Sequence, residues 1–242
     1  MCLAVVAWKA AARFPLLLAA NRDERHDRPT APAAWWPDLP NVLGGRDLEA
    51  RGTWLAIERS GRIAAVTNFR EPAQAPHGRS RGALVTGFLA GRATVDEYAA
   101  VVAAHGRDYG PFNLLLFDGH ELRYLSNRAR PVRLAPGVHA LSNAALEADW
   151  PKMRTAHRGM EGITMSAAPT EELFELLARR SAAPPADRYR TAHFIDGPVY
   201  GTRCSTVITI DSAGEVSFAE RSFDAAARLT SEVRETFRLT PS

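Results

Sequence analysis

The feature that most constrains the fold is a series of short apolar runs that occur in pairs. Leu3–Trp8 and Leu16–Ala20 are separated only by the polar and turn-forming segment Lys9–Pro15. Similar pairs occur within residues 112–126 and 206–220, each interrupted by a glycine-containing turn. Apolar runs of this length joined by short turns are typical of β-hairpins. The sequence therefore predicts sheets that are mainly antiparallel.

Segments with helical spacing lie between these strand pairs, whereas the proline-rich stretch 29–40 is expected to be irregular. Strand pairs that alternate with helices favour an α+β architecture of two mainly antiparallel sheets covered by helices. The chain has no internal repeat and no low-complexity linker, so we expect a single domain over residues 1–242. The expected helices are 81–91, 95–105, 147–158 and 170–180.

Composition excludes several classes of function. The 30 Lys and Arg residues nearly balance the 27 Asp and Glu residues and are scattered, so we expect no nucleic-acid partner. No apolar run approaches the ~18 residues of a membrane-spanning helix. The seven histidines show no ligand spacing, and no metal site is expected. Two cysteines and no secretory leader favour reduced thiols and a cytoplasmic location.

Cys2 is the first candidate for chemistry. Removal of Met1, which is usual before a small residue, would place a thiol and a free α-amine on one residue. The reference pKa of an α-amine is about 7.7–8.0, so near neutral pH it accepts the thiol proton during attack on a substrate. Cys2 is thus a candidate nucleophile. The alternative is that Cys2 is a small apolar residue at the start of a strand.

The polar segment 21–24 follows the second apolar run. A hairpin would return this segment to the start of the chain, so we expect it to surround Cys2. Asp23 would hold the α-ammonium, and Arg22 would bind an acidic or carbonyl-bearing substrate, with Asn21 and Glu24 as further substrate-binding groups. The alternative is a solvated, charged turn.

Three more polar residues occur at the ends of predicted strands or just before one. Asn68 and Asn143 carry neutral amide donors that suit the oxyanion of a tetrahedral intermediate, although each residue type is also common in turns. Arg203 precedes the last hairpin and would be a second anion-binding group. Cys204 is expected to be structural.

Taken together, these segments resemble the NRDE family, also called the transport and Golgi organisation protein 2 family. The matching pieces follow the family order over residues 1 to about 225. They are Met1-Cys2, Ala19–Glu24, Arg28-Pro29, Gly52–Leu55, Ala65–Asn68, Arg81-Gly82, Phe112–Leu115, Leu141–Ala144, Trp150–Lys152 and Tyr200–Arg203.

The NRDE family in turn resembles the cysteine N-terminal-nucleophile acylases, which include choloylglycine hydrolase and penicillin V acylase. This resemblance implies a four-layer αββα sandwich with Cys2, Asp23, Asn68 and Asn143 as catalytic residues. The acylases have an arginine where this chain has Ala20.

Two functions follow as expectations. The first is an amidohydrolase or acyl-transfer protein that acts on an amide or thioester of a small acyl ligand and requires no cofactor. The second follows from the known associations of the NRDE family: a non-enzymatic trafficking protein that binds haem or an acyl-CoA or lipid ligand in the same pocket.

Overall fold

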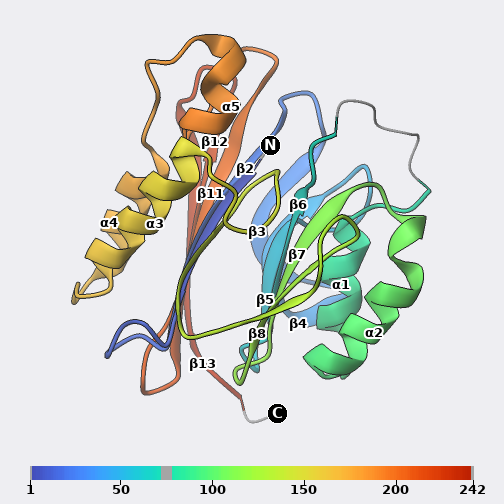
Figure 1. Ribbon diagram of the computed structural model, residues 1–242. Helices are drawn as coiled ribbons and strands as arrows, with labels where there is room; N and C mark the ends of the chain where they lie inside the picture. The colour runs from blue at the N-terminus through green and yellow to red at the C-terminus, as the bar shows by residue number, and fades with distance from the viewer. Residues whose placement is uncertain (1, 72–77, 241–242) are drawn as a thin grey trace. The chain divides into compact units, whose positions relative to one another are not determined.

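The computed structural model describes residues 2–71 and 78–240. Within them the chain forms two compact units, each built from one antiparallel sheet and several helices (Figure 1). The first unit contains residues 2–27, 136–142 and 146–238, and the second contains residues 28–71, 78–135, 143–145 and 239–240. The predicted antiparallel pairing is confirmed, and the expectation of one domain over residues 1–242 stays a prediction.

The first unit has a six-stranded sheet, with helices α3 and α4 packed on one face (Figure 1). The order of its strands is β10 (Gly137–Leu141), β1 (Cys2–Trp8), β2 (Leu16–Arg25), β11 (Tyr200–Ile210), β12 (Glu215–Phe223) and β13 (Leu229–Arg238). Its helices are α3 (Pro151–Ile163), α4 (Pro169–Leu177) and the short α5 (Arg188–Thr191), preceded by a 3-10 turn at Pro185–Asp187.

The second unit has a seven-stranded sheet in which every strand neighbours the next one in sequence. Its strands are β3 (Thr30–Trp36), β4 (Leu39–Asp47), β5 (Leu55–Glu58), β6 (Ile63–Asn68), β7 (Phe112–Phe117), β8 (Leu122–Ser126) and β9 (Val132–Leu134). Helix α1 (Gly82–Ala90) packs on β4, β5 and β6, and α2 (Val95–His105), followed by a 3-10 turn at Gly106–Asp108, packs on β8.

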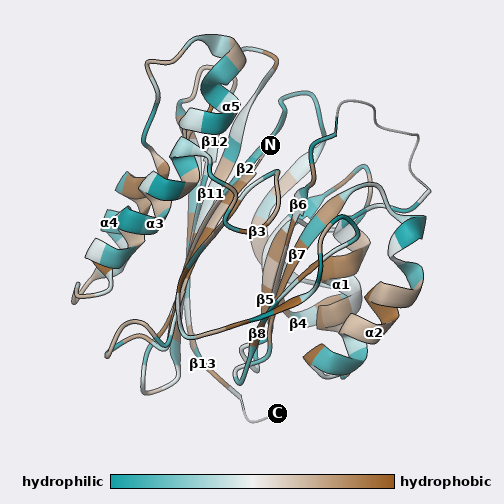
Figure 2. Cartoon of the chain, viewed as in Figure 1, coloured by the Kyte–Doolittle hydropathy of each residue, from teal (hydrophilic) through white to brown (hydrophobic). Residues whose placement is uncertain are grey.

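Alternation along β1 explains how the core of the first unit forms. Leu3, Val5 and Ala7 point to the same side of the strand and belong to one buried cluster with Met153 of α3 and Leu173 of α4. A fully buried Leu, Val or Met side chain contributes roughly 1.5–3 kcal/mol. In Figure 2, α3 and α4 carry both apolar and polar stretches, as expected of helices with one buried face. Cys2 and the even-numbered residues of β1 therefore point away from these helices.

One expectation and one alternative interpretation of local structure are wrong. The stretch 29–40 is not irregular, because it contains β3 and the start of β4. Pro32 is tolerated there because β3 lies at the edge of its sheet, where one side of the strand makes no ladder bonds. The segment 21–24 is not a turn, because β2 continues to Arg25 and pairs with both β1 and β11. No helix among the described residues has the length and apolar character needed to cross a bilayer.

Candidate functional site

Strand register in the first unit places Cys2, Arg22 and Cys204 side by side. Cys2 pairs with Arg22 across β1 and β2, and Arg22 pairs with Cys204 across β2 and β11. All three lie on the sheet face that points away from α3 and α4. Arg22 is buried and lies 4.0 Å from the Glu24 carboxylate. The sheet thus places a guanidinium next to the candidate nucleophile.

Cys2 is half-buried, and its carbonyl accepts a 2.6 Å hydrogen bond from the Ser142 hydroxyl. Burial raises the pKa of the Cys2 thiol, and the negative charge of Asp23 acts in the same direction. A hydrogen bond with the Asp23 backbone and the positive charge of Arg22 oppose this rise in pKa. Because the net effect is upward, Cys2 rests as a thiol and needs a base when it attacks.

Asp23 is buried on the opposite face of β2, and its position is fixed by β11. The Thr202 hydroxyl donates a 2.6 Å hydrogen bond to Asp23 Oδ1 and accepts one from the Ile195 amide at 2.9 Å. Tyr200 donates to the Asp23 carbonyl at 2.8 Å. Burial raises the pKa of Asp23, while the charge of Lys152 and the Thr202 hydrogen bond act against the rise.

A register shift in β11 brings Thr202 to Asp23. Thr202 pairs with Asp23 and Cys204 with Arg22, which leaves Arg203 as an extra residue between them. Bulges of this kind re-aim side chains and often occur beside functional sites. The Arg203 guanidinium donates a 2.8 Å hydrogen bond to the Arg25 carbonyl, and burial lowers the pKa of Arg203.

The Asn21 side chain is buried, and its polar atoms hydrogen-bond to neighbouring parts of the first unit. Its Nδ2 donates to the carbonyls of Leu177 and His193, both at 2.9 Å, and its Oδ1 accepts from the Ser205 hydroxyl at 2.6 Å. With both amide hydrogens and the oxygen engaged, Asn21 ties β2 to the end of α4. Asn21 therefore positions β2, and its role in substrate binding stays a prediction.

The predicted residues Asn68 and Asn143 belong to the second unit, where they contact each other. Asn143 is buried and donates from Nδ2 to the Asn68 carbonyl at 2.7 Å, while its own carbonyl accepts from the Arg70 amide at 2.8 Å. Beneath them, Asn113 donates to Thr67 and to the Ala144 carbonyl. Asn68 and Asn143 are thus neighbours in the second unit, and the oxyanion role of their side-chain amides stays a prediction.

Lys152 is a residue of the first unit that sequence reasoning did not assign to the site. It is fully buried in the first turn of α3, and its Nζ has no hydrogen-bond partner among the described residues. Burial lowers the pKa of Lys152, whereas electrostatic interactions with Asp23 and Cys2 act in the opposite direction. The available signal was its position four residues before Ala156 on the apolar face of α3, where a lysine is unusual.

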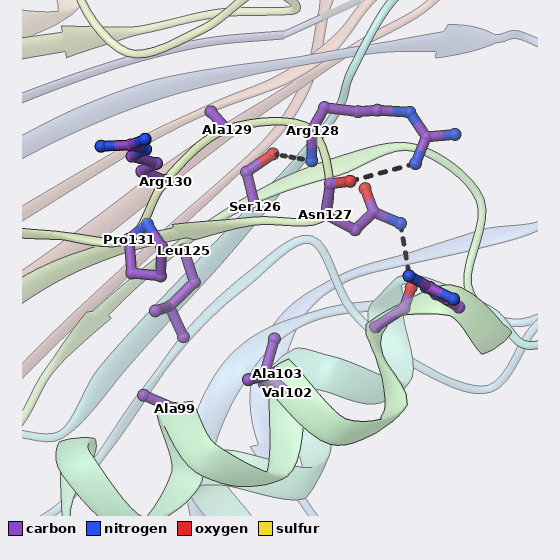
Figure 3. A pocket seen from close by; sticks show the side chains of 12 residues that line it. Ala99, Val102, Ala103, Leu125, Ser126, Asn127, Arg128, Ala129, Arg130 and Pro131 are labelled. Carbon is purple, nitrogen blue, oxygen red and sulfur yellow. Dashed lines mark hydrogen bonds between the residues drawn. The ribbon is translucent and has the colours of Figure 1, made fainter.

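The second unit also contains a hollow of about 650 Å³, which Figure 3 shows between α2 and the segment after β8. Val102 and Leu125 form its apolar wall, and Asn127 donates to the Gly106 carbonyl at 2.9 Å. None of the residues predicted from the sequence as site residues lines this hollow. The described residues contain no group of three or more His, Cys, Asp or Glu side chains arranged to hold a metal ion.

A family model named Transport and Golgi organisation 2 matches residues 1–225, nearly the whole chain. The chain belongs to this family. The "Transport and Golgi organization 2 homolog" of Mus musculus is 34% identical over 240 residues, covering 86% of this chain and 87% of the relative. The corresponding protein of Bos taurus is 36% identical over 240 residues, with the same coverage.

Two solved structures share the fold of this Transport and Golgi organisation 2 family member. A Caenorhabditis elegans N-acylethanolamine-hydrolyzing acid amidase ortholog aligns with a TM-score of 0.52 and 11% identity, covering 86% of this chain and 92% of its own. A variant of conjugated bile acid hydrolase from Clostridium perfringens aligns with a TM-score of 0.55 and 8% identity, covering 100% and 98%. The α+β, N-terminal-nucleophile hydrolase-like fold predicted from the sequence is confirmed.

Proposed function

We propose that this chain is a cysteine N-terminal-nucleophile amidohydrolase or acyl-transfer protein. Its nucleophile would be Cys2 after removal of Met1, and its substrate an amide or thioester of a small acyl ligand. The observation that carries the proposal is the placement of the Cys2 thiol beside Arg22 and within the electrostatic influence of buried Asp23. The solved structures of the same fold are named as an acid amidase and a hydrolase of conjugated bile acids, which supports this reaction class.

In this mechanism each residue has a separate task. The α-amine of processed Cys2 takes the thiol proton, and Asp23, held by Thr202, orients that amine. The sulfur then bonds to the acyl carbon, and the leaving amine or thiol departs with the proton. Arg22 binds the acidic or carbonyl-bearing part of the substrate. The oxyanion would be stabilised by the amides of Asn68 and Asn143.

Hydrolysis of a panel of acyl amides and acyl thioesters tests the proposal. We expect processed wild-type protein to turn over at least one member, and Cys2→Ala to lose this activity because the nucleophile is gone. Cys204→Ala is the matched control, since Cys204 is buried and its pKa is raised well above the ordinary value by burial. The proposal fails if the whole panel is inert with Met1 shown to be removed, or if Cys2→Ala remains as active as Cys204→Ala.

The alternative of a haem or acyl-ligand carrier has less support in this structure. Haem iron needs an axial ligand such as His or Cys. The buried His193 has both ring nitrogens engaged, Nδ1 with the Leu176 carbonyl at 2.7 Å and Nε2 with Thr155 at 2.8 Å. Burial also favours the protonated thiol of Cys2 over the thiolate that would bind iron. A Soret shift on haem titration that disappears in Cys2→Ala, without any turnover of the substrate panel, would favour the carrier.

The same chemistry supports a cytoplasmic location for the active protein. In the described part of the chain, neither Cys2 nor Cys204 is part of a disulfide. A nucleophilic thiol has to stay reduced, and the cytosol maintains that state.

A further inference from the structure

Strand β13 is an open edge of the six-stranded sheet in the first unit. In the described part of the chain it has a strand neighbour on one side only, where it pairs with β12. The outer side of an edge strand can pair with a strand of another chain. Proteins usually prevent such pairing with short edge strands, prolines, bulges or lysines. The four sheet edges of this chain differ in how far they use these devices.

The other three edges are short or irregular. Strand β9 has three residues and β10 has five. Strand β3 contains Pro32, and its pairing with β4 shifts register twice. Strand β13, by contrast, has ten residues without proline, glycine or lysine, and its residues 231–238 pair with β12 in one unbroken register. Among the described strands, β13 is therefore the edge best suited to accept a further strand.

Two charged side chains of β13 are held in place on the side of the sheet that carries α4. Arg234 donates hydrogen bonds to Glu232 and to Glu171 of α4. Arg221 of β12 donates to Glu232 at 2.7 Å and to Glu171 at 2.8 Å. The Arg234 side chain is still 50% exposed and that of Glu232 27% exposed, so both can meet a partner. The edge thus carries one positive and one negative group, two residues apart on one face.

The sequence of β13 is complementary to itself in one antiparallel register. When a twofold axis passes through the sheet, each residue lies opposite itself or opposite a residue an even number of positions away. With the axis at Val233, Glu232 of each copy lies opposite Arg234 of the other. Val233 then lies opposite itself, and Ser231 lies opposite Glu235. Both charged pairs across the axis are of opposite sign.

The neighbouring registers bring like charges together. An axis at Glu232, Arg234 or Glu235 would place a charged residue opposite itself. An axis at Thr236 would place Arg234 opposite Arg238. Like charges directly opposite each other destabilise a strand pair, whereas opposite charges stabilise it. Charge therefore selects the register described above.

We propose that β13 is an interface through which two copies of this chain associate, by antiparallel pairing of their β13 strands about Val233. The two six-stranded sheets then join into one sheet of twelve strands. Backbone hydrogen bonds between the two strands supply the attraction, and the pairs of Glu232 with Arg234 fix the register. Three strands separate β13 from β1, so this association is independent of the reaction proposed for Cys2.

Sedimentation equilibrium of the full-length chain tests the association before any residue is changed. We expect the average mass to rise from that of one chain to that of two as the protein concentration increases through the micromolar range. The mass of a single chain at every concentration would overturn the proposal.

Charge variants test the register. In Arg234→Glu, both attractive pairs across the axis become repulsive, so we expect the dissociation constant of the dimer to rise at least about tenfold. Glu232→Arg should weaken the dimer in the same way. The matched control is Arg158→Glu, which makes the same change of charge at an exposed position of α3 and should associate as wild type does. An Arg234→Glu variant that associates as tightly as Arg158→Glu would contradict the proposal.

A mixture of the two weakened variants separates strand pairing from a general loss of structure. One strand then carries two acidic groups and the other two basic groups, so every charged pair across the axis is again of opposite sign. We expect an equimolar mixture of Arg234→Glu and Glu232→Arg to be dimeric at a concentration where each alone is monomeric. A mixture that stays monomeric would rule out the proposed register.

A disulfide at the axis gives a measurement that leaves the charges unchanged. Val233→Cys places two thiols opposite each other, close enough to be oxidised to a disulfide. In Ser231→Cys the equivalent positions lie roughly 14 Å apart along the two strands, too far for a disulfide. We expect a cross-linked dimer joined at residue 233 in Val233→Cys and none in Ser231→Cys, as shown by peptide mass spectrometry. No cross-link in Val233→Cys, or equal cross-linking in both variants, would overturn the proposal.

Discussion

Buried charged side chains of the first unit occur in the second half of β2 and in the first turn of α3. Arg22, Asp23 and Lys152 are nearly inaccessible, although these residue types are almost never buried unless paired. Removing a charged group from water costs several kcal/mol, which only well-placed partners offset. The fold supplies such partners for Asp23 through Thr202 and the backbone. A cost of this kind at one end of a sheet is characteristic of a functional site.

Replacement of Asp23 by asparagine tests this interpretation at the level of one residue. Burial raises the folded-state pKa of Asp23 above its ordinary value of 3.8. As pH rises between these two values, the unfolded chain loses its proton first, so stability falls across this window. Asp23→Asn removes the penalty and keeps an oxygen that can accept from Thr202. We expect the melting temperature of Asp23→Asn, relative to wild type, to be higher at pH 7 than at pH 4.

For each pH unit between the two pKa values, the free energy of unfolding of wild type relative to Asp23→Asn should fall by about 1.4 kcal/mol. For a chain of this length, each kcal/mol corresponds to roughly 2–4 °C in melting temperature. The control is Asp27→Asn, because Asp27 is exposed and its hydrogen bond with Arg25 lowers its pKa, which gives the opposite sign. A pH-independent difference between Asp23→Asn and wild type would show that the folded and unfolded pKa values are equal.

At the scale of secondary-structure elements, β11 positions Asp23 of the candidate site through Thr202. The register shift in β11 that brings Thr202 to Asp23 could not be predicted from the sequence. The apolar runs predicted the β1–β2 hairpin, because period-two burial leaves a visible pattern. They did not predict that β2 continues through charged residues to Arg25, because β11, which pairs with these residues, comes from the far end of the chain. Lys152 was missed for the same reason: its environment depends on contacts between α3 and β1.

Thr202→Val tests the role of the bulge. The substitution keeps the shape but removes the hydroxyl that donates to Asp23 and accepts from the Ile195 amide. Leaving buried polar groups unsatisfied costs roughly 1–3 kcal/mol each, so we expect a clear loss of stability in urea unfolding. Thr209→Val is the matched control, since Thr209 is buried on the same strand and lies seven residues after Thr202. Equal stabilities of the two variants would contradict the assigned role of Thr202.

At the scale of the whole molecule, the order in which strands pair determines which parts of the chain must be present for each unit to fold. The central strands of the first unit come from both ends of the sequence, with β1 and β2 paired to β10 and β11. The second unit is formed mainly by residues 28–135. The first unit therefore cannot form until nearly the whole chain is present. The expectation of a single domain over residues 1–242 stays a prediction.

Unfolding in urea tests that prediction. The tryptophans are divided between the units, with Trp8 and Trp150 in the first and Trp35, Trp36 and Trp54 in the second. If the chain is one cooperative domain, tryptophan fluorescence and far-ultraviolet circular dichroism will give the same midpoint. Separate fluorescence transitions in variants that retain the tryptophans of only one unit would contradict it.

The central claim is that Cys2, as the first residue of the processed chain, forms a covalent bond to an acyl group. Rapid acid quench during turnover, followed by intact-mass and peptide mass spectrometry, tests it most directly. The predicted species lacks Met1, carries one acyl group, and has that group on the peptide that begins with Cys2. A protein that hydrolyses substrate while Cys2 stays unmodified, or in which the acyl group lies only on Cys204 or Lys152, would contradict the claim.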